Sequence, residues 1–118
     1  MGERKNTIPE KYQEELKQWK AKHGTVRAIS IDDNGNDKVL FFRLPTRPEL
    51  SAAENMSIDD STGQMDLYKK AEKMMVDCYL GGDIALEKIM EDVETFMLVA
   101  KNVLYDFMKE KKTSLIDC

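Results

Sequence analysis

The stretch from residue 39 to residue 56 constrains the fold most, because two prolines separate an apolar run from a helical pattern. Residues 39–44 read V-L-F-F-R-L, the most apolar β-like run in the chain. Pro45 ends a strand there because it has no N–H to donate to a sheet. Pro48 favours the first turn of a helix, where that N–H is not needed. We therefore expect a structural junction between strand and helix, made of Pro45, Thr46, Arg47 and Pro48.

A tight hairpin is predicted ahead of this junction. Residues 26–31 form a short apolar strand pattern, and the following D-D-N-G-N-D contains Asn34-Gly35, a pair preferred where both turn residues need positive φ. The same segment has oxygen side chains at alternate positions, but it lacks the glycine and the glutamate of a calcium loop. We interpret it as a hairpin. Because the strand at 39–44 is apolar on both faces, we expect both sides of the sheet to be covered, or one side to meet a partner.

Helical periodicity dominates the rest of the chain. The first predicted helix has a thin apolar stripe and packs on the edge of the domain. A helix at 65–79 is expected to end at Gly81-Gly82, and Asp83 is expected to cap the next one. The predicted helices are 9–23, one that begins at Pro48, 65–79, and 84–112 with a break near 90–92. The fold class is α+β, with an N-terminal helix and one β-hairpin packed against three to four C-terminal helices.

Length and composition predict one domain over residues 1–118, with mobile tails at 1–7 and 113–118. The net charge of −4 argues against nucleic-acid binding, which needs a surplus of Lys and Arg. There is no signal-peptide pattern and no membrane-spanning run. Cys78 and Cys118 fit no metal or redox spacing, and Cys78 is expected to be a small buried hydrophobe. We expect a cytoplasmic protein with no membrane partner.

The sequence contains no constellation typical of catalysis. His23 is the only histidine and lies at the end of a helix, where a cation is favoured. Gly81-Gly82 precedes Asp83, which would repel a phosphate rather than bind it. The paired carboxylates lie in polar surroundings, where they stay ionised. We therefore predict a non-enzymatic protein with no cofactor and no metal.

Methionine is abundant: eight of the 118 residues are Met, and six of them lie in the helical half. Flexible thioethers fill a core, and they also fit variable apolar partners. Both readings stay open here. We expect the Met/Phe face of the last helix to be partly exposed or to form an oligomer contact. The candidate partner-binding residues are Met74, Met75, Phe96, Met97, Val103, Phe107 and Met108.

The order of elements resembles that of small phage tail assembly chaperones of the siphophage type. Two phrases carry the resemblance: R-L-P-T-R-P-E-L at residues 43–50, directly after the hairpin, and D-C-Y-L-G-G-D at residues 77–83. The similarity covers residues 26–107. The N-terminal helix with Trp19 lies outside that pattern.

The resemblance implies a non-enzymatic helper that binds the long helical tape-measure protein and aids assembly of tail-tube subunits around it. Such a protein acts in the host cytoplasm and is not expected in the mature virion. An alternative is a small adaptor or regulatory protein of a phage or mobile element, which binds one protein partner through its C-terminal helix.

Overall fold

The computed structural model describes residues 8–106 and 114–117. The described part of the chain begins with a 3-10 turn, η1, and continues through five α-helices, three strands and a final π-helical turn, η2. Within the described residues, no helix is long and apolar enough to cross a membrane. The elements, in order, are η1 (Glu10–Tyr12), α1 (Gln13–His23), β1 (Val26–Asp33), β2 (Asn36–Arg43), α2 (Arg47–Met56), α3 (Leu67–Cys78), β3 (Tyr79–Gly82), α4 (Leu86–Glu91), α5 (Val93–Lys101) and η2 (Asn102–Asp106).

The predicted hairpin is confirmed. β1 and β2 pair antiparallel over eight residues each, from Asp33 opposite Asn36 at the turn to Val26 opposite Arg43. Both turn residues have positive φ, 53° at Asn34 and 86° at Gly35. The N–H of Gly35 also donates to the Asp32 carboxylate, at 2.9 Å. The turn chemistry therefore sets the register of the hairpin.

The prediction that Gly81-Gly82 ends a helix is wrong, because both glycines belong to a third strand. α3 ends at Cys78, and β3 pairs antiparallel with β2, with Gly81 opposite Phe41 and Gly82 opposite Leu40. A Cβ at Gly82 would lie 2.4 Å from the Val39 carbonyl oxygen, so only glycine lets the two backbones approach so closely. The sheet order is β1-β2-β3.

Asp83 does not cap the next helix, contrary to the prediction. The N-cap of α4 is Ala85, which makes no side-chain cap. The Asp83 carboxylate instead accepts the N–H of Val39 at 2.8 Å and the hydroxyl of Tyr12 at 2.7 Å. Lys11 lies 2.9 Å from the same carboxylate. Asp83 thus ties the N-terminal helical segment to β2.

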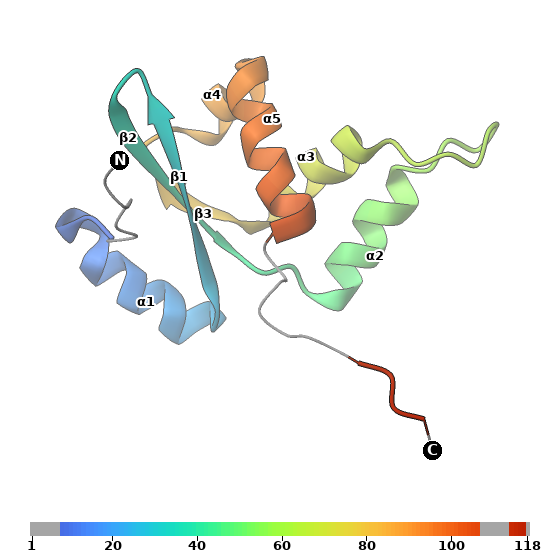
Figure 1. The fold of residues 1–118 in the computed structure, drawn as a ribbon, viewed down its shortest axis with the longest axis horizontal. Helices are drawn as coiled ribbons and strands as arrows, with labels where there is room; N and C mark the ends of the chain where they lie inside the picture. The colour runs from blue at the N-terminus through green and yellow to red at the C-terminus, as the bar shows by residue number, and fades with distance from the viewer. Residues whose placement is uncertain (1–7, 107–113, 118) are drawn as a thin grey trace.

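Both faces of β2 are covered, which is the first of the two outcomes expected for a strand that is apolar on both faces. On one face, Phe41 packs against Tyr12 and Trp19, with ring centroids 5.1 and 5.3 Å apart. On the other face, Leu40 and Phe42 are fully buried in the main core. Figure 1 shows α1 on one side of the sheet and α3 and α5 on the other. As predicted, α1 packs at the edge of the core, and none of its residues is fully buried.

The main core joins the inner face of the hairpin to α2–α5 and η2. Cys78 belongs to it, which confirms its prediction as a buried hydrophobe. The core residues are Ile29, Ile31, Leu40, Phe42, Ala53, Ala71, Met74, Met75, Cys78, Ile89, Val99, Ala100 and Val103. The helical half thus packs on the hairpin as an α+β fold, with four helices after the hairpin and one strand more than predicted.

The predicted strand-to-helix junction is a complete N-terminal cap. The Thr46 hydroxyl accepts the N–H of Glu49 at 3.3 Å, and the Glu49 carboxylate accepts the N–H of Thr46 at 2.8 Å. These reciprocal bonds form a capping box. Pro48 lies within the first helical turn. An N–H there has no acceptor within the helix, so the helix loses no hydrogen bond to the proline.

The break predicted near residues 90–92 is confirmed at Asp92, which separates α4 from α5. Its carboxylate accepts the N–H of Thr95 at 3.2 Å and so caps α5. Residues 114–117 have no regular structure. The predictions for 1–7, for the end of the last helix at 107–112, for residue 113 and for residue 118 fall outside the described residues.

Candidate functional site

An apolar groove lies between the start of α3 and the outer side of α5. Its volume is about 470 Å³. Met65 and Leu67 come from the α3 side, and Met97 and Leu104 from the α5–η2 side. Tyr68 and Tyr105 are both more than half exposed, at 55% and 57%. The complete lining is Met65, Asp66, Leu67, Tyr68, Met97, Ala100, Lys101, Leu104 and Tyr105.

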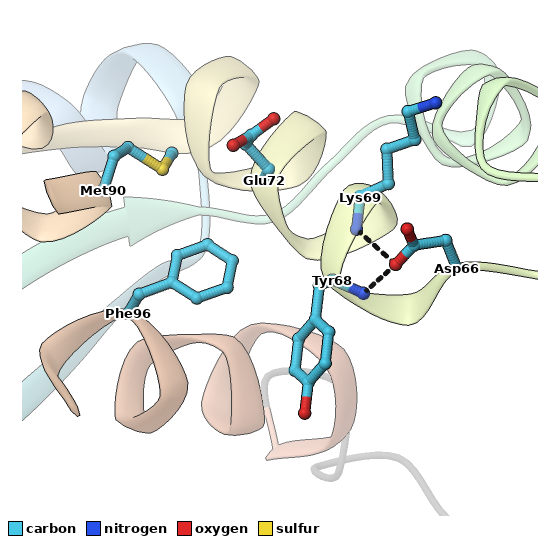
Figure 2. Close-up of a pocket in the computed structure, with 6 residues that line it drawn as sticks. All are labelled: Asp66, Tyr68, Lys69, Glu72, Met90 and Phe96. Carbon is cyan, nitrogen blue, oxygen red and sulfur yellow. Dashed lines mark hydrogen bonds between the residues drawn. The ribbon is translucent and has the colours of Figure 1, made fainter. Parts of the chain in front are cut away.

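A second hollow of about 310 Å³ continues this surface on the other side of Tyr68. Figure 2 shows Tyr68 extending from the start of α3 toward α5, with Phe96 and Met90 beyond it. The Tyr68 and Phe96 rings are 6.3 Å apart between centroids. Asp66, Lys69 and Glu72 give this hollow a polar border. We name the two hollows together the α3–α5 groove.

Local hydrogen bonds hold the α3 side of the groove in place. The Asp66 carboxylate caps α3 by accepting the N–H groups of Tyr68 and Lys69, at 3.0 and 3.2 Å. The N–H of Asp66 donates to the Ser57 carbonyl at 2.8 Å, and Ile58 and Met65 form a β-bridge. These bonds fix the first turn of α3, so Leu67 and Tyr68 are presented on a rigid element.

The residues predicted to bind a partner divide into two groups. Met74, Met75 and Val103 are buried in the core, because the inner faces of α3 and of η2 turn toward the hairpin. They do not contribute to the groove surface. Phe96 is half-buried and Met97 is 46% exposed, and both line the α3–α5 groove. Phe107 and Met108 lie outside the described residues. Among the described residues, the expectation of a partly exposed Met/Phe face is therefore met at Phe96 and Met97 of α5.

Sequence reasoning missed the α3 half of the groove. Leu67 shares one helical stripe with Met74 and Met75, and the prediction used this stripe and not the residues beside it. Tyr68 lies off the stripe and is exposed, as are Met65 and Tyr105. The available signal was a surplus of large apolar residues around the start of α3, beyond what one buried face requires.

Two observations concern the reactive side chains of the described residues. These residues contain no group of three or more His, Cys, Asp or Glu side chains placed to hold a metal ion. Burial raises the pKa of the Cys78 thiol to about 11, so the thiolate that a nucleophile needs is scarce at neutral pH. The arrangement is suited to apolar contact with another molecule.

Comparisons with known proteins do not assign the chain to a family. No protein-family model matches it. Searches of curated proteins and of solved structures find no match either.

Proposed function

We propose that this protein is a phage tail assembly chaperone, which binds the tape-measure protein through the α3–α5 groove. The observation that carries the proposal is the exposed apolar groove itself, whose lining includes Tyr68 and Met97. An exposed apolar surface bordered by polar residues is typical of a protein interaction site. The sequence resemblance at residues 43–50 and 77–83 supplies the class of partner.

The groove is suited to one face of an amphipathic helix. Such a helix binds by laying apolar side chains into a groove between two elements. Met65 and Met97 can change rotamer to fit different side chains along a long client, because thioether chains are flexible. Tyr68 and Tyr105 add large contact area at a small cost in conformational entropy.

Charged side chains surround the apolar lining without one sign dominating. Asp66 and Glu72 are acidic, and Lys69 and Lys101 are basic. A mixed border fits a client whose polar face varies along its length. It also favours reversible binding, which the proposed function requires because tail-tube subunits displace the chaperone.

In this proposal the protein acts in the host cytoplasm, has no enzymatic activity and is absent from the finished virion. Co-expression tests it. The tape-measure protein of the same phage, insoluble when made alone, is expected to become soluble and to co-purify with this chain. If it stays in the pellet in the presence of the folded chain, the proposal fails.

Groove variants test whether binding uses the proposed surface. Tyr68→Asp and Met97→Asp each place a charge in the apolar lining and are expected to weaken client binding at least tenfold, about 1.4 kcal/mol or more. Val76→Asp is the matched control, because Val76 is also an exposed apolar residue of α3, at 56%, and does not line the groove. Equal client binding by all three variants would exclude the groove.

A further inference from the structure

Asn34 is the one asparagine of the chain that a glycine follows, and it lies in the turn of the hairpin. Asparagine is a chemically labile residue, because the backbone nitrogen of the next residue can attack its side-chain amide. Glycine offers the least steric resistance to this attack, since it has no Cβ. Asn34 and Gly35 are both exposed to solvent. The residues that follow the other asparagines all carry side chains: Thr7, Asp37, Met56 and Val103.

The reaction at such a pair needs water as its only co-reactant. The Gly35 nitrogen forms a bond to the side-chain carbonyl carbon of Asn34, and the bond from that carbon to the amide nitrogen breaks. Ammonia leaves with the proton of the Gly35 N–H, and a five-membered cyclic imide remains. Water then opens the imide at one of its two carbonyls. Opening at the side-chain carbonyl gives aspartate, and opening at the main-chain carbonyl gives isoaspartate, in which the backbone runs through the side chain.

The folded turn holds the two reacting atoms apart. A φ of 53° at Asn34 and of 86° at Gly35 corresponds to a type I′ turn. The first residue of such a turn has a ψ of about 30°. At that ψ the Gly35 nitrogen lies on the opposite side of the Cα–C bond from the Asn34 Cβ. The side-chain carbonyl carbon cannot reach the nitrogen without rotation about this bond, so ring closure requires the turn to open.

Asp32 stabilises the closed turn and acts on the attacking atom itself. Its carboxylate accepts the N–H of Gly35 at 2.9 Å. The Gly35 nitrogen must give up this proton during the attack, and a negatively charged acceptor opposes that loss. Among the described residues, nothing lies within 4 Å of a Cβ placed at Gly35, so packing on that side does not hold the turn shut. The hydrogen bond to Asp32 is therefore the contact that protects the pair.

We propose that Asn34 is a site of spontaneous modification to aspartate and isoaspartate, which the closed turn, held by Asp32, suppresses and which opening of the turn permits. The rate of modification follows the population of the open form, because the closed form does not react. The fraction of modified chains therefore records how long the hairpin has been open. This inference does not depend on the proposed function.

The two products have different effects on the hairpin. Isoaspartate adds one atom to the backbone of the turn, and a turn of two residues sets the register of this hairpin. The pairing of Asp33 with Asn36, which flanks the turn, is the first that the added atom disturbs. Aspartate tolerates the left-handed conformation much as asparagine does, so it adds a negative charge without lengthening the backbone. Isoaspartate is therefore the product that prevents the original turn from closing again.

Mass spectrometry of the full chain tests the proposal. The protein is kept in mildly alkaline buffer, with and without concentrated urea. Peptide mapping locates the mass gain from exchange of the amide NH2 for OH, and fragmentation by electron transfer distinguishes isoaspartate from aspartate. Asn34 is expected to react about tenfold or more slowly in the native protein than in urea, because only the open form reacts. Equal rates in the two conditions would overturn the proposal, and so would an Asn34 that stays unmodified in urea.

Two neighbouring carboxylates provide a matched pair of variants. Asp32→Ala removes the acceptor of the Gly35 N–H and should speed the native reaction at Asn34 about fivefold, the effect of losing one hydrogen bond. Asp33→Ala makes the same charge change beside Asn34 but keeps that bond, so its native rate should stay near that of the wild type. In urea both variants should react as the wild type does, and circular dichroism checks that both fold without urea. A native rate no faster in Asp32→Ala than in Asp33→Ala would refute the protection by Asp32.

Discussion

Arg43 and Glu49 form a bidentate ion pair across the junction between β2 and α2, with both N–O distances at 2.7 Å. The same guanidinium donates to the carbonyl of Asp77 at 2.7 Å, near the end of α3. One arginine thus joins a strand and two helices. Glu49 also closes the capping box with Thr46, so the ion pair and the helix cap share one carboxylate. Bidentate pairs of this kind are among the stronger polar interactions in proteins.

Removal of Arg43 is expected to cost more stability than removal of an exposed charge. Arg43→Ala should lower the free energy of unfolding by about 2–3 kcal/mol, because it leaves Glu49 and the Asp77 carbonyl without their donor in a partly buried site. Urea denaturation measures the change. Lys88→Ala, which breaks the exposed pair with Glu91, is the control and should cost less than about 0.5 kcal/mol. A double-mutant cycle with Glu49→Ala should show coupling between the two residues. Equal losses in Arg43→Ala and Lys88→Ala would contradict this account.

The ion pair also predicts how stability depends on pH. The hydrogen bonds from Arg43, and then that from the Thr46 N–H, lower the pKa of Glu49 from 4.5 to about 2. Between these values the unfolded chain binds a proton that the folded chain does not, so stability falls as the pH falls. The contribution is present above about pH 4.5 and disappears toward pH 2. It is about 1–2 kcal/mol, less than the full pKa shift would give, because solvent screens this partly exposed pair. Unfolding measured across this range should show a shallower slope in Glu49→Gln than in the wild type. Parallel profiles for the two proteins would refute the assignment.

The close approach of β3 to β2 makes Gly82 intolerant of any side chain. Gly82→Ala would place a Cβ 2.4 Å from the Val39 carbonyl oxygen, and backbone atoms cannot move aside without disturbing the sheet. We expect a loss of about 2–4 kcal/mol in the free energy of unfolding. Gly63→Ala is the control: Gly63 has a φ of 72° but open space around it, so its loss should be about 1 kcal/mol. A smaller loss at Gly82 than at Gly63 would show that the strands separate easily.

The Cys78 thiol is expected to report on opening of the core. It is 2% exposed, and burial raises its pKa to about 11. In a Cys118→Ser protein, a thiol reagent at pH 8 should label Cys78 slowly in native conditions and rapidly in denaturant. Arg43→Ala should speed the native labelling, because it lowers the free energy of opening. Immediate labelling of the native protein would show that Cys78 is accessible.

The local elements of this fold were predictable because their causes are local. Asn34-Gly35 has few alternatives to a tight turn, and the prolines at 45 and 48 restrict the backbone around them. The covered faces of β2 followed from the apolar residues on both of its sides. The third strand was not predictable in the same way, since Gly81-Gly82 is as typical of a helix end as of a close backbone approach.

The candidate groove was predictable only in part. Methionine content indicated adaptable apolar contacts, and Met97 does lie on the surface. Helical spacing places Met74 on the apolar stripe of α3 and Tyr68 off it, but it cannot show that Tyr68 lines a groove against α5.

The sequence by itself determined the hairpin, the junction at 45–48 and the α+β class, because turn and cap preferences act over a few neighbouring residues. The tertiary structure decided where Asp83 and Arg43 make their contacts. Asp83 reaches Val39 and Tyr12, and Arg43 reaches Asp77, all of them more than thirty residues away along the chain. Such contacts depend on how the N-terminal helical segment and α3 pack on the sheet. They are set by packing of the whole chain, which local sequence preference does not encode.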